Sequence, residues 1–217
     1  MLVEIWSDVV CPFCYIGKRE FEKAMAELQI ENTINIIWKS YELAPNMPFN
    51  NLKTSYEYFM EKYQVDMNSA KKAHQSVADR ARTLGLIYNF EKVVPANTNR
   101  AHQMLQFSKD QGNQYTVKEA LMKAYFTDGK RLDNILVLLK IGEEQGLDRE
   151  HLRYVLERGM YVKPVLEDRD EALQYGFTGV PTFLINKKYF IKGAQTADVF
   201  KDFLKRVLKE SGGISDN

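Results

Sequence analysis

The first forty residues alternate between strand-like and helix-like patterns of apolar side chains. Residues 2–7 are rich in β-branched and aromatic side chains, which predicts a short buried strand ending just before Cys11. Apolar residues then recur at helical spacing as far as Leu28, and residues 33–38 alternate again as a second strand. A strand, a helix and a strand at this spacing predict a parallel βαβ unit.

The middle of the chain, from about residue 56 to residue 175, has a helical pattern throughout. Its apolar residues recur three and four positions apart in successive segments. Glycines that can end such helices are Gly85, Gly112, Gly129 and Gly146. Thr98 and Asp133 precede two of these segments, and we expect their side chains to cap the helices that follow.

The sequence pattern typical of β-strands returns after Gly176. Residues 181–186 and 189–191 predict two strands joined through Lys187-Lys188, and residues 199–208 predict a closing helix. The order β-α-β, helices, β-β-α therefore predicts an α/β chain: a thioredoxin-like fold with an inserted all-helical domain.

The same pattern sets the predicted domain limits. They are residues 1–42 and 176–211 for the thioredoxin-like domain, 43–175 for the inserted helical domain and 212–217 for a flexible tail.

Charge and hydropathy exclude some classes of partner. The 217 residues carry 30 basic and 29 acidic side chains, a formal net charge of +1, whereas a nucleic-acid partner requires a basic face. The apolar runs are much shorter than the roughly 18 residues of a membrane span. The first residues show no basic and apolar leader, so we expect a cytoplasmic protein, and we favour a monomer.

The chain has two cysteines, Cys11 and Cys14, and they lie at the start of the first predicted helix. Unpaired N–H groups and the positive end of the helix dipole favour a thiolate at Cys11. Cys14 lies one turn further on the same face, where its sulfur can attack a mixed disulfide formed at Cys11. Pro12 suits the first helical position, where a missing N–H has no cost.

Two other interpretations of the cysteine pair are a zinc site and a structural disulfide. A zinc site needs two further ligands, and His74, His102 and His151 lack the spacing of a histidine pair. A purely structural disulfide would close a very small loop and is uncommon in the cytosol. A redox-active pair is the favoured interpretation.

A second motif far downstream resembles a known loop. Residues 177–183 contain Val180-Pro181-Thr182 directly before a strand, similar to the cis-proline loop of thioredoxin-fold proteins. Together with the Cys-Pro-Phe-Cys motif and the helical insertion, this loop makes the chain resemble the DsbA family. The resemblance implies that Cys11 is the nucleophile, that Cys14 resolves, and that Pro181 is cis beside the disulfide. Val180 would then offer its backbone to an extended substrate.

A narrower resemblance concerns residues 7–17 and Gly193-Ala194-Gln195, which are similar to the FrnE-like branch. The opening stretch, with serines for the cysteines, also looks like kappa-class glutathione transferases and 2-hydroxychromene-2-carboxylate isomerases. Kappa-class enzymes have an acidic and a basic residue for glutathione where this chain has Gln195 and Thr196.

Three functions follow from these resemblances. The first is a thiol–disulfide oxidoreductase that acts as oxidase, reductase or isomerase on protein or small-molecule thiols and disulfides. The second is a glutathione-dependent isomerase or transferase of a small aromatic substrate. The third is a redox sensor or peptide-binding module without catalysis. We expect no cofactor beyond the Cys11–Cys14 disulfide and no metal, with glutathione as a possible co-substrate.

Two neighbours of the cysteines are predicted to tune them. Phe13 stands where DsbA has a histidine, so Cys11 should be less acidic and the disulfide less oxidising than in DsbA; Phe13 also suits an apolar substrate surface. Asp8 either opposes the thiolate, accepts the proton of Cys14, or is a solvated turn residue.

The helical insertion offers a few polar candidates for the site. Asn97, Thr98 and His102 could line the cleft, since the FrnE-like branch has similar residues there. A helix cap followed by a surface histidine is the favoured alternative. His74 and His151 are expected on helix surfaces.

Overall fold

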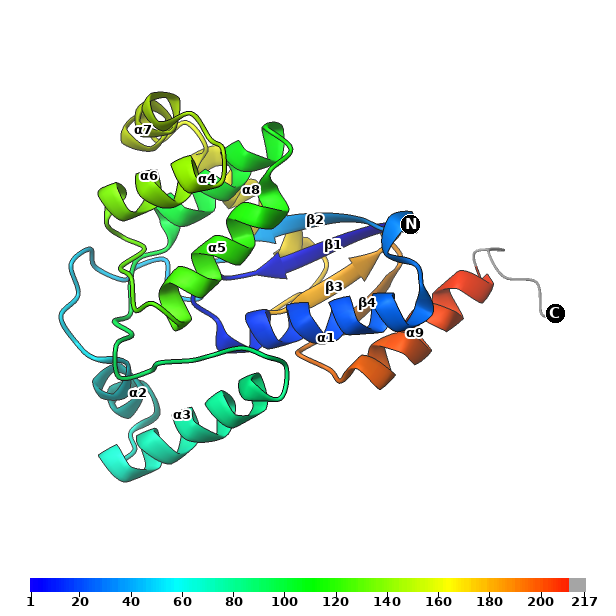
Figure 1. The fold of residues 1–217 in the computed structure, drawn as a ribbon, viewed down its shortest axis with the longest axis horizontal. Helices are drawn as coiled ribbons and strands as arrows, with labels where there is room; N and C mark the ends of the chain where they lie inside the picture. Colours follow the sequence, from blue (N-terminus) through cyan, green and yellow to red (C-terminus); the bar gives the residue numbers. More distant parts are fainter. Residues whose placement is uncertain (211–217) are drawn as a thin grey trace.

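A four-stranded sheet forms the centre of the molecule, whose computed structural model describes residues 1–210 (Figure 1). The strands are β1 (Leu2–Ser7), β2 (Asn35–Ser40), β3 (Thr182–Ile185) and β4 (Tyr189–Lys192), in the spatial order β2-β1-β3-β4. β1 runs parallel to β2 and antiparallel to β3, and β3 and β4 form an antiparallel hairpin. With helices inserted between β2 and β3, this is the predicted thioredoxin-like fold.

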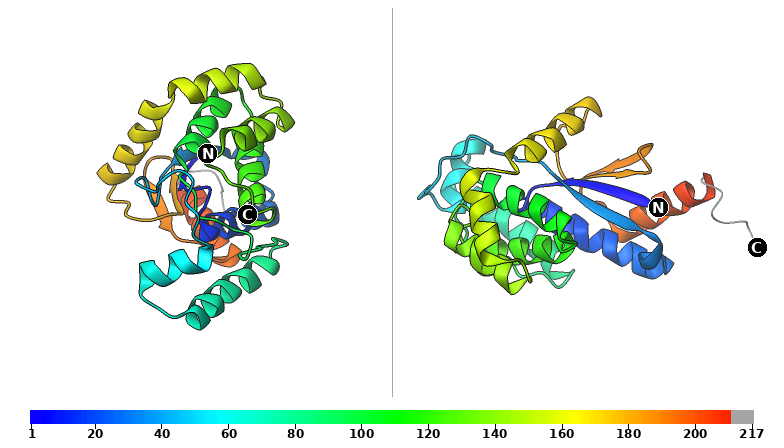
Figure 2. Two further views of the ribbon diagram at one scale, coloured as in Figure 1. Left: turned by 90° about the vertical axis from the view of Figure 1, so that its left-hand side faces the viewer. Right: turned by 90° about the horizontal axis from the view of Figure 1, so that it is seen from above.

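Helices cover both faces of the sheet, as the view from above shows (Figure 2). α1 (Pro12–Leu28) and α9 (Ala197–Glu210) pack on one face, where Ile5, Phe21 and Phe200 are buried in a shared apolar cluster. α8 (Val162–Gln174) covers the other face around Trp6. Both faces of β1, the strand that leads to the cysteines, are therefore buried.

The insertion between the strands contributes six further helices before α8. They are α2 (Ser55–Tyr63), α3 (Met67–Arg82), α4 (Asn99–Asp110), α5 (Gln114–Phe126), α6 (Ile135–Glu144) and α7 (Arg149–Arg158). α2 and α3 form a hairpin set apart from the bundle of α4 to α7 (Figures 1 and 2). The predicted limits of the two domains stay a prediction, and the predicted tail, residues 212–217, lies outside the described residues. No helix in residues 1–210 is long and apolar enough to cross a membrane.

Asp168 of α8 ties the insertion to the sheet. Its carboxylate accepts hydrogen bonds from the Ser40 backbone and the Gln106 amide and pairs with Lys39 at 2.7 Å. Its backbone carbonyl accepts a bond from the Trp6 indole at 2.7 Å. Because a buried carboxylate is tolerated when it is paired and hydrogen-bonded, this one residue joins α8 to β1, β2 and α4. The end of β1 that leads to the cysteines is thus held in place.

Two strand predictions were displaced by local backbone geometry. Residues 33–38 were expected as the second strand, but Glu31–Thr33 form a 3₁₀ turn and β2 spans Asn35–Ser40, in register with Leu2–Ser7 of β1. The hairpin turn is centred on Asn186 and Lys187, not on Lys187-Lys188. Both central residues have positive φ, 49° and 57°, which a type I′ turn requires and asparagine tolerates well.

Two predicted caps were wrong, and a neighbouring asparagine takes each role. Thr98 stands at the start of α4 without a side-chain cap bond, while the Asn97 side chain accepts from the Asn99 backbone at 3.0 Å. Asn134, not Asp133, accepts from the first turn of α6. The Asp133 carboxylate instead pairs with Arg131. At each helix start two neighbouring residues have side chains that can accept the capping hydrogen bond, and the sequence pattern does not distinguish between them.

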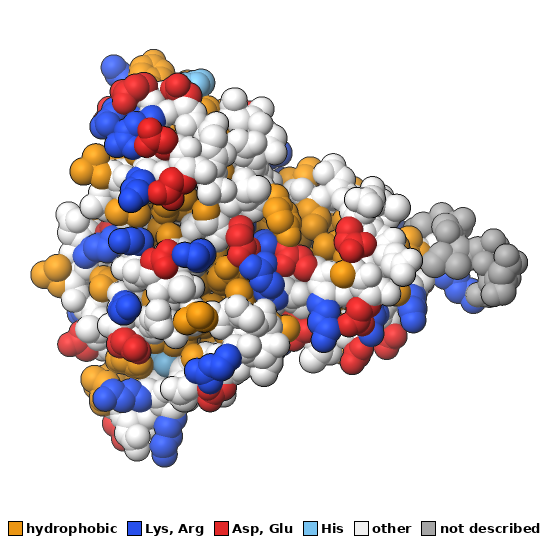
Figure 3. All heavy atoms as spheres, viewed as in Figure 1, with side chains coloured by type: hydrophobic (Ala, Val, Ile, Leu, Met, Phe, Trp, Pro, Cys, Tyr) orange, Lys and Arg blue, Asp and Glu red, His pale blue; other side chains and the backbone are white. Residues whose placement is uncertain are grey.

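Charged side chains are distributed evenly over the face seen in Figure 3. Acidic and basic groups alternate there, without a patch of a single sign. This agrees with the near-zero net charge of +1.

Candidate functional site

The two cysteines lie at the first turn of α1, directly after β1. Cys11 is the N-terminal cap residue, Pro12 is the first helical residue, and the Cys14 N–H donates to the Cys11 carbonyl at 3.0 Å. Both thiols are free in this structure, and their exposed fractions are 4% for Cys11 and 1% for Cys14. The sequence expectation of a cysteine pair opening the first helix is confirmed.

The downstream loop lies against this helix start. The Val180–Pro181 peptide bond is cis, as the resemblance implied. The Cys11 thiol lies 3.9 Å from the Val180 carbonyl oxygen, which it can reach as a weak donor. The Val180 N–H has no acceptor within residues 1–210, so this stretch of backbone keeps a free donor beside the cysteines.

Gly17 makes this close approach possible. A Cβ atom on Gly17 would lie 3.0 Å from Cγ of Pro181 and 3.4 Å from Cα of Ala194. Any larger residue would therefore push the loop away from α1. The glycine of the Cys-Pro-Phe-Cys-Tyr-Ile-Gly stretch thus has a steric role at the site.

Asp8 and His102 form a buried pair beneath the cysteines. Both side chains are 0% exposed, and His102 Nε2 lies 3.2 Å from Asp8 Oδ1. Asp8 also accepts from the backbone N–H groups of Val10 and Leu43. Burial works against ionisation of Asp8, but the bond and charge of His102 and the Leu43 N–H outweigh it and lower the pKa of the carboxyl. Asp8 is therefore not a solvated turn residue, and His102 is not a surface histidine, because the insertion closes over both.

Lys118 of α5 is a site residue that the sequence analysis missed. Its side chain is 0% exposed, and Nζ lies 3.5 Å from the Ser7 carbonyl oxygen and 5.4 Å from the Trp38 ring. Burial lowers the pKa of Lys118 to about 8, although the neighbouring Cys14 and Asp8 favour the charged form. Its burial could have been predicted from the sequence, because Lys118 lies in the apolar stripe of its helix, four residues before the buried Met122.

These charged neighbours and the contact between the two sulfurs affect the ionisation of both thiols. The hydrogen bond with Cys14, together with burial, raises the pKa of Cys11 well above its ordinary value. Burial also opposes ionisation of Cys14, but the bond from Cys11 and the charge of Lys118 prevail and lower its pKa. The two thiols share one hydrogen bond and Lys118 stabilises a negative charge on the pair, while the thiolate expected at Cys11 from the helix start stays a prediction.

A cavity of about 540 Å³ opens beside Cys11 and not beside Cys14. Phe13, which is 42% exposed, and Val180 also line it. Its far wall is the α2–α3 hairpin, which includes His74. His74 was expected on a helix surface, but it is 9% exposed and packs edge-on to Phe90 at 4.5 Å between ring centroids. A molecule in this cavity can therefore reach the sulfur of Cys11 but not that of Cys14.

The other polar candidates of the insertion have structural partners instead. The Asn97 amide donates to the Met47 carbonyl oxygen at 2.8 Å, and Asn97 and Thr98 are absent from the cavity wall. Within residues 1–210, no three His, Cys, Asp or Glu side chains gather as a metal site would require.

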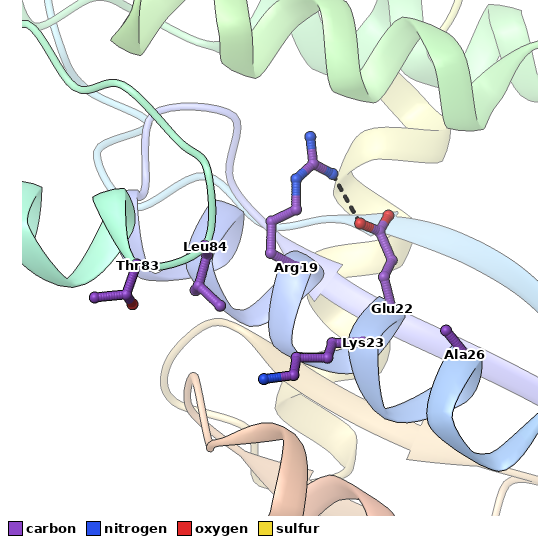
Figure 4. Close-up of a pocket in the computed structure, with 6 residues that line it drawn as sticks. All are labelled: Arg19, Glu22, Lys23, Ala26, Thr83 and Leu84. Atoms are coloured by element: carbon purple, nitrogen blue, oxygen red, sulfur yellow. Dashed lines mark hydrogen bonds and ion pairs between the residues drawn. The ribbon is translucent and has the colours of Figure 1, made fainter.

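A separate hollow of about 470 Å³ lies on the outer face of α1 (Figure 4). Arg19 and Glu22 line it and pair with each other at 2.7 Å, as the dashed line shows. Thr83 and Leu84, from the segment after α3, close its other side. Neither cysteine reaches this hollow, so it is not part of the thiol site.

Comparisons with known proteins agree with this geometry. An uncharacterized protein of Bacillus subtilis (strain 168), YwbO, is 28% identical over 210 residues, covering 92% of this chain and 93% of its own. A probable DsbA oxidoreductase from Streptomyces coelicolor has a TM-score of 0.91 and 30% identity over 100% of this chain and 92% of its own.

More distant structures share the fold. A 2-hydroxychromene-2-carboxylate isomerase has a TM-score of 0.75 at 17% identity, covering 100% of both chains. The cytosolic disulfide reductase DsbM from Pseudomonas aeruginosa, solved with GSH, has a TM-score of 0.66 at 15% identity, covering 96% of this chain and 100% of its own. The family model of the DSBA-like thioredoxin domain matches residues 2–205. The chain therefore belongs to the DsbA-like thioredoxin-domain family.

Proposed function

We propose that this protein exchanges disulfides with protein substrates through Cys11 and Cys14. One observation carries the proposal: Cys11 faces both the cavity and the Val180 carbonyl, whereas Cys14 is shielded behind it. A substrate sulfur can approach Cys11, and Cys14 is one helical turn away to complete the exchange.

The chemistry takes two steps in the direction of substrate reduction. The Cys11 sulfur attacks a disulfide R–S–S–R′, a Cys11–S–S–R bond forms, and R′S⁻ leaves and takes a proton. The Cys14 thiolate then attacks Cys11 Sγ, a Cys11–Cys14 bond forms, and RS⁻ leaves and takes a proton from water. Two electrons pass from the cysteine pair to the substrate, and the reverse sequence oxidises a dithiol.

The buried charges suit the second step. The charge of Lys118 favours the thiolate at Cys14, the sulfur that must attack the mixed disulfide. For the first step the proton on Cys11 passes to Cys14, which the hydrogen bond between the two thiols permits. Cys11 thus makes the first attack because a substrate can reach it. The nearby charge of Lys118 favours the thiolate that Cys14 needs to attack the mixed disulfide.

An extended substrate backbone would pair with the free N–H of Val180 beside Pro181. Glutathione receives less support as an obligatory co-substrate, since the Gln195 amide already donates to the Lys192 carbonyl at 2.8 Å. We therefore propose the cysteine pair as the whole redox centre, without a further cofactor. A reducing cytosol, the compartment named for the DsbM neighbour, is our proposed location.

Matched single-cysteine variants test the assignment. Cys14→Ala should accumulate mixed disulfides with reduced-and-rescrambled ribonuclease, because the resolving attack is lost, whereas Cys11→Ala should accumulate none. Non-reducing gel electrophoresis and mass spectrometry measure both. Trapping at Cys14 in the Cys11→Ala variant would reverse the roles.

Turnover separates catalysis from sensing. We expect the native protein to accelerate insulin reduction by dithiothreitol and both variants to be inactive. A native protein that cycles between oxidised and reduced forms without accelerating this reaction would be a sensor, and the proposed enzyme activity would be rejected.

A further inference from the structure

The cavity beside Cys11 has the size of a small-molecule site. Its volume is about 540 Å³, and aromatic side chains such as Tyr58, Phe59 and Phe126 form much of its wall. A dry protein cavity of about 150 Å³ holds one benzene molecule, so this one has room for a fused-ring group. Small-molecule sites span about 300–1,000 Å³, and the cavity lies within that range.

The polar side chains of the wall are largely satisfied. The Ser55 hydroxyl donates to the Phe90 carbonyl at 2.7 Å. His74 Nδ1 bonds the Ala70 carbonyl at 2.8 Å, and burial lowers the pKa of this imidazole, so the ring is neutral. Apart from Lys62, whose side chain is exposed, the lining residues are uncharged, so the depth of the cavity disfavours a charged group.

A buried tyrosine contributes its hydroxyl to the wall. Tyr125 is 4% exposed and lines the cavity, and its hydroxyl makes no hydrogen bond with any residue of the described chain. Burial raises the pKa of Tyr125, so the hydroxyl stays protonated and can donate. The hydroxyl is open to the cavity, so a polar substituent on a bound ligand can accept a hydrogen bond from it. The charged side chain of Lys62 is exposed, and its Nζ lies 5.7 Å from the ring centroids of Tyr58 and Tyr63.

We propose that this cavity binds the organic group of low-molecular-weight aromatic disulfides, with the disulfide bond presented to Cys11. The substrate class is an uncharged fused-ring aryl disulfide with one hydrogen-bonding substituent. The inference rests on the proposed function, because it uses the same cysteine pair, and it adds a substrate class that does not need the Val180 edge.

The reaction of such a disulfide, ArS–SAr, balances without another reactant. Cys11 Sγ attacks one sulfur, a Cys11–S–S–Ar bond forms, and ArS⁻ leaves. Cys14 attacks Cys11 Sγ, the Cys11–Cys14 disulfide forms, and the second ArS⁻ leaves. The one proton of the cysteine pair passes to the first ArS⁻, the second ArS⁻ takes its proton from water, and the substrate gains two electrons.

Paired substrates and cavity-filling variants test the proposal. The probes are 2,2′-dihydroxy-6,6′-dinaphthyl disulfide and the small, polar hydroxyethyl disulfide, each mixed with the reduced full-length protein. Ala73→Phe fills the cavity from α3, and Val77→Phe is a second filling variant. Lys72→Phe, at an exposed position of the same helix outside the wall, is the matched control.

The native protein should show saturation with the naphthyl disulfide and a linear rate with hydroxyethyl disulfide. Each filling variant should lower the rate constant for the naphthyl disulfide by about tenfold or more, since burial of the aryl surface is lost. The rate with hydroxyethyl disulfide should change less than twofold, which also shows that the variant is folded. Lys72→Phe should change neither.

Two results overturn the proposal. Filling variants that leave the ratio of the two rates unchanged would show that the aryl group does not enter the cavity, and so would a native protein without saturation. These results are distinguishable from failure of the proposed function, in which the native protein would not oxidise with hydroxyethyl disulfide either.

Discussion

Replacing Lys118 with methionine should stabilise the protein. The pKa of Lys118 falls from its usual 10.5 to about 8 because the ammonium is fully buried. A shift of this size corresponds to about 3 kcal/mol by which the fold disfavours the charged side chain. Methionine has a similar length and no charge, so Lys118→Met should raise the free energy of unfolding by about 3 kcal/mol at pH 7. The disulfide form carries no thiolate opposite Lys118, so the gain there should be at least this large.

The gain should depend on pH in a defined direction. Below about pH 8, folded and unfolded Lys118 are both protonated, and the full cost of burial is present. Between about pH 8 and the usual pKa of 10.5, the unfolded chain binds more protons, so the native protein gains stability as the pH rises. The advantage of the variant should therefore shrink from about 3 kcal/mol at pH 7 to about 2 kcal/mol at pH 9.

Urea unfolding of the oxidised proteins at both pH values measures this difference. Lys123→Met is the control: it lies on the same helix, its side chain is 59% exposed, and it should change the stability by less than about 0.5 kcal/mol. A Lys118→Met protein that is less stable than the native one, or a gain that does not change with pH, would refute the reasoning. In that case Lys118 would be held by partners that compensate its burial completely.

Three further predictions concern the cysteine turn. Phe13→His should add a donor beside Cys11 and, if it lowers the thiol pKa by one to two units, raise the reduction potential by roughly 30–60 mV in a glutathione titration; an unchanged potential would mean that residue 13 does not face the sulfur. Gly17→Ala should cost roughly 1–2 kcal/mol in urea unfolding despite the better helix propensity, because the new Cβ meets Pro181 at 3.0 Å, and an equally stable variant would show that the loop adapts. The folded state lowers the pKa of Asp8, so its contribution to stability is present above about pH 4 and lost as the pH falls below it. Asp8→Asn should therefore lose less stability than the native protein between pH 5 and pH 3, and parallel losses would exclude Asp8 as the source.

The sequence revealed those parts of the site that depend on local order. Cys11 and Cys14 follow a strand and begin a helix, and the strand pattern and Pro12 make both visible in a single stretch. The loop at Val180 is visible in the sequence because the strand β3 follows its Val-Pro-Thr motif directly. Fold class came from the same source, since the order of periodic segments reflects the order of elements along the sheet.

The missing parts depend on contacts between distant segments. His102 and Lys118 belong to different helices, and both reach the end of β1 because the insertion folds back over it. No spacing within the chain encodes that contact, so the pattern placed His102 on a surface. It also missed Lys118, a cation more than a hundred residues away from Cys14 whose charge lowers the pKa of that thiol.

Because the α2–α3 hairpin is one continuous segment, the residues that shape the cavity are separate in the chain from the residues that carry the redox chemistry. The sulfur chemistry rests on β1, α1 and the loop at Val180, whereas the far wall of the cavity comes largely from one continuous segment, residues 55–82. Arg80 secures that segment near its end, where its guanidinium donates to the Ala194 carbonyl and lies 3.7 Å from Glu20. Substitutions within this segment, or its replacement by another hairpin, would therefore change which substrates the protein binds while leaving the redox-active cysteines unchanged. Relatives with the same cysteine pair could differ in substrate specificity through this segment alone.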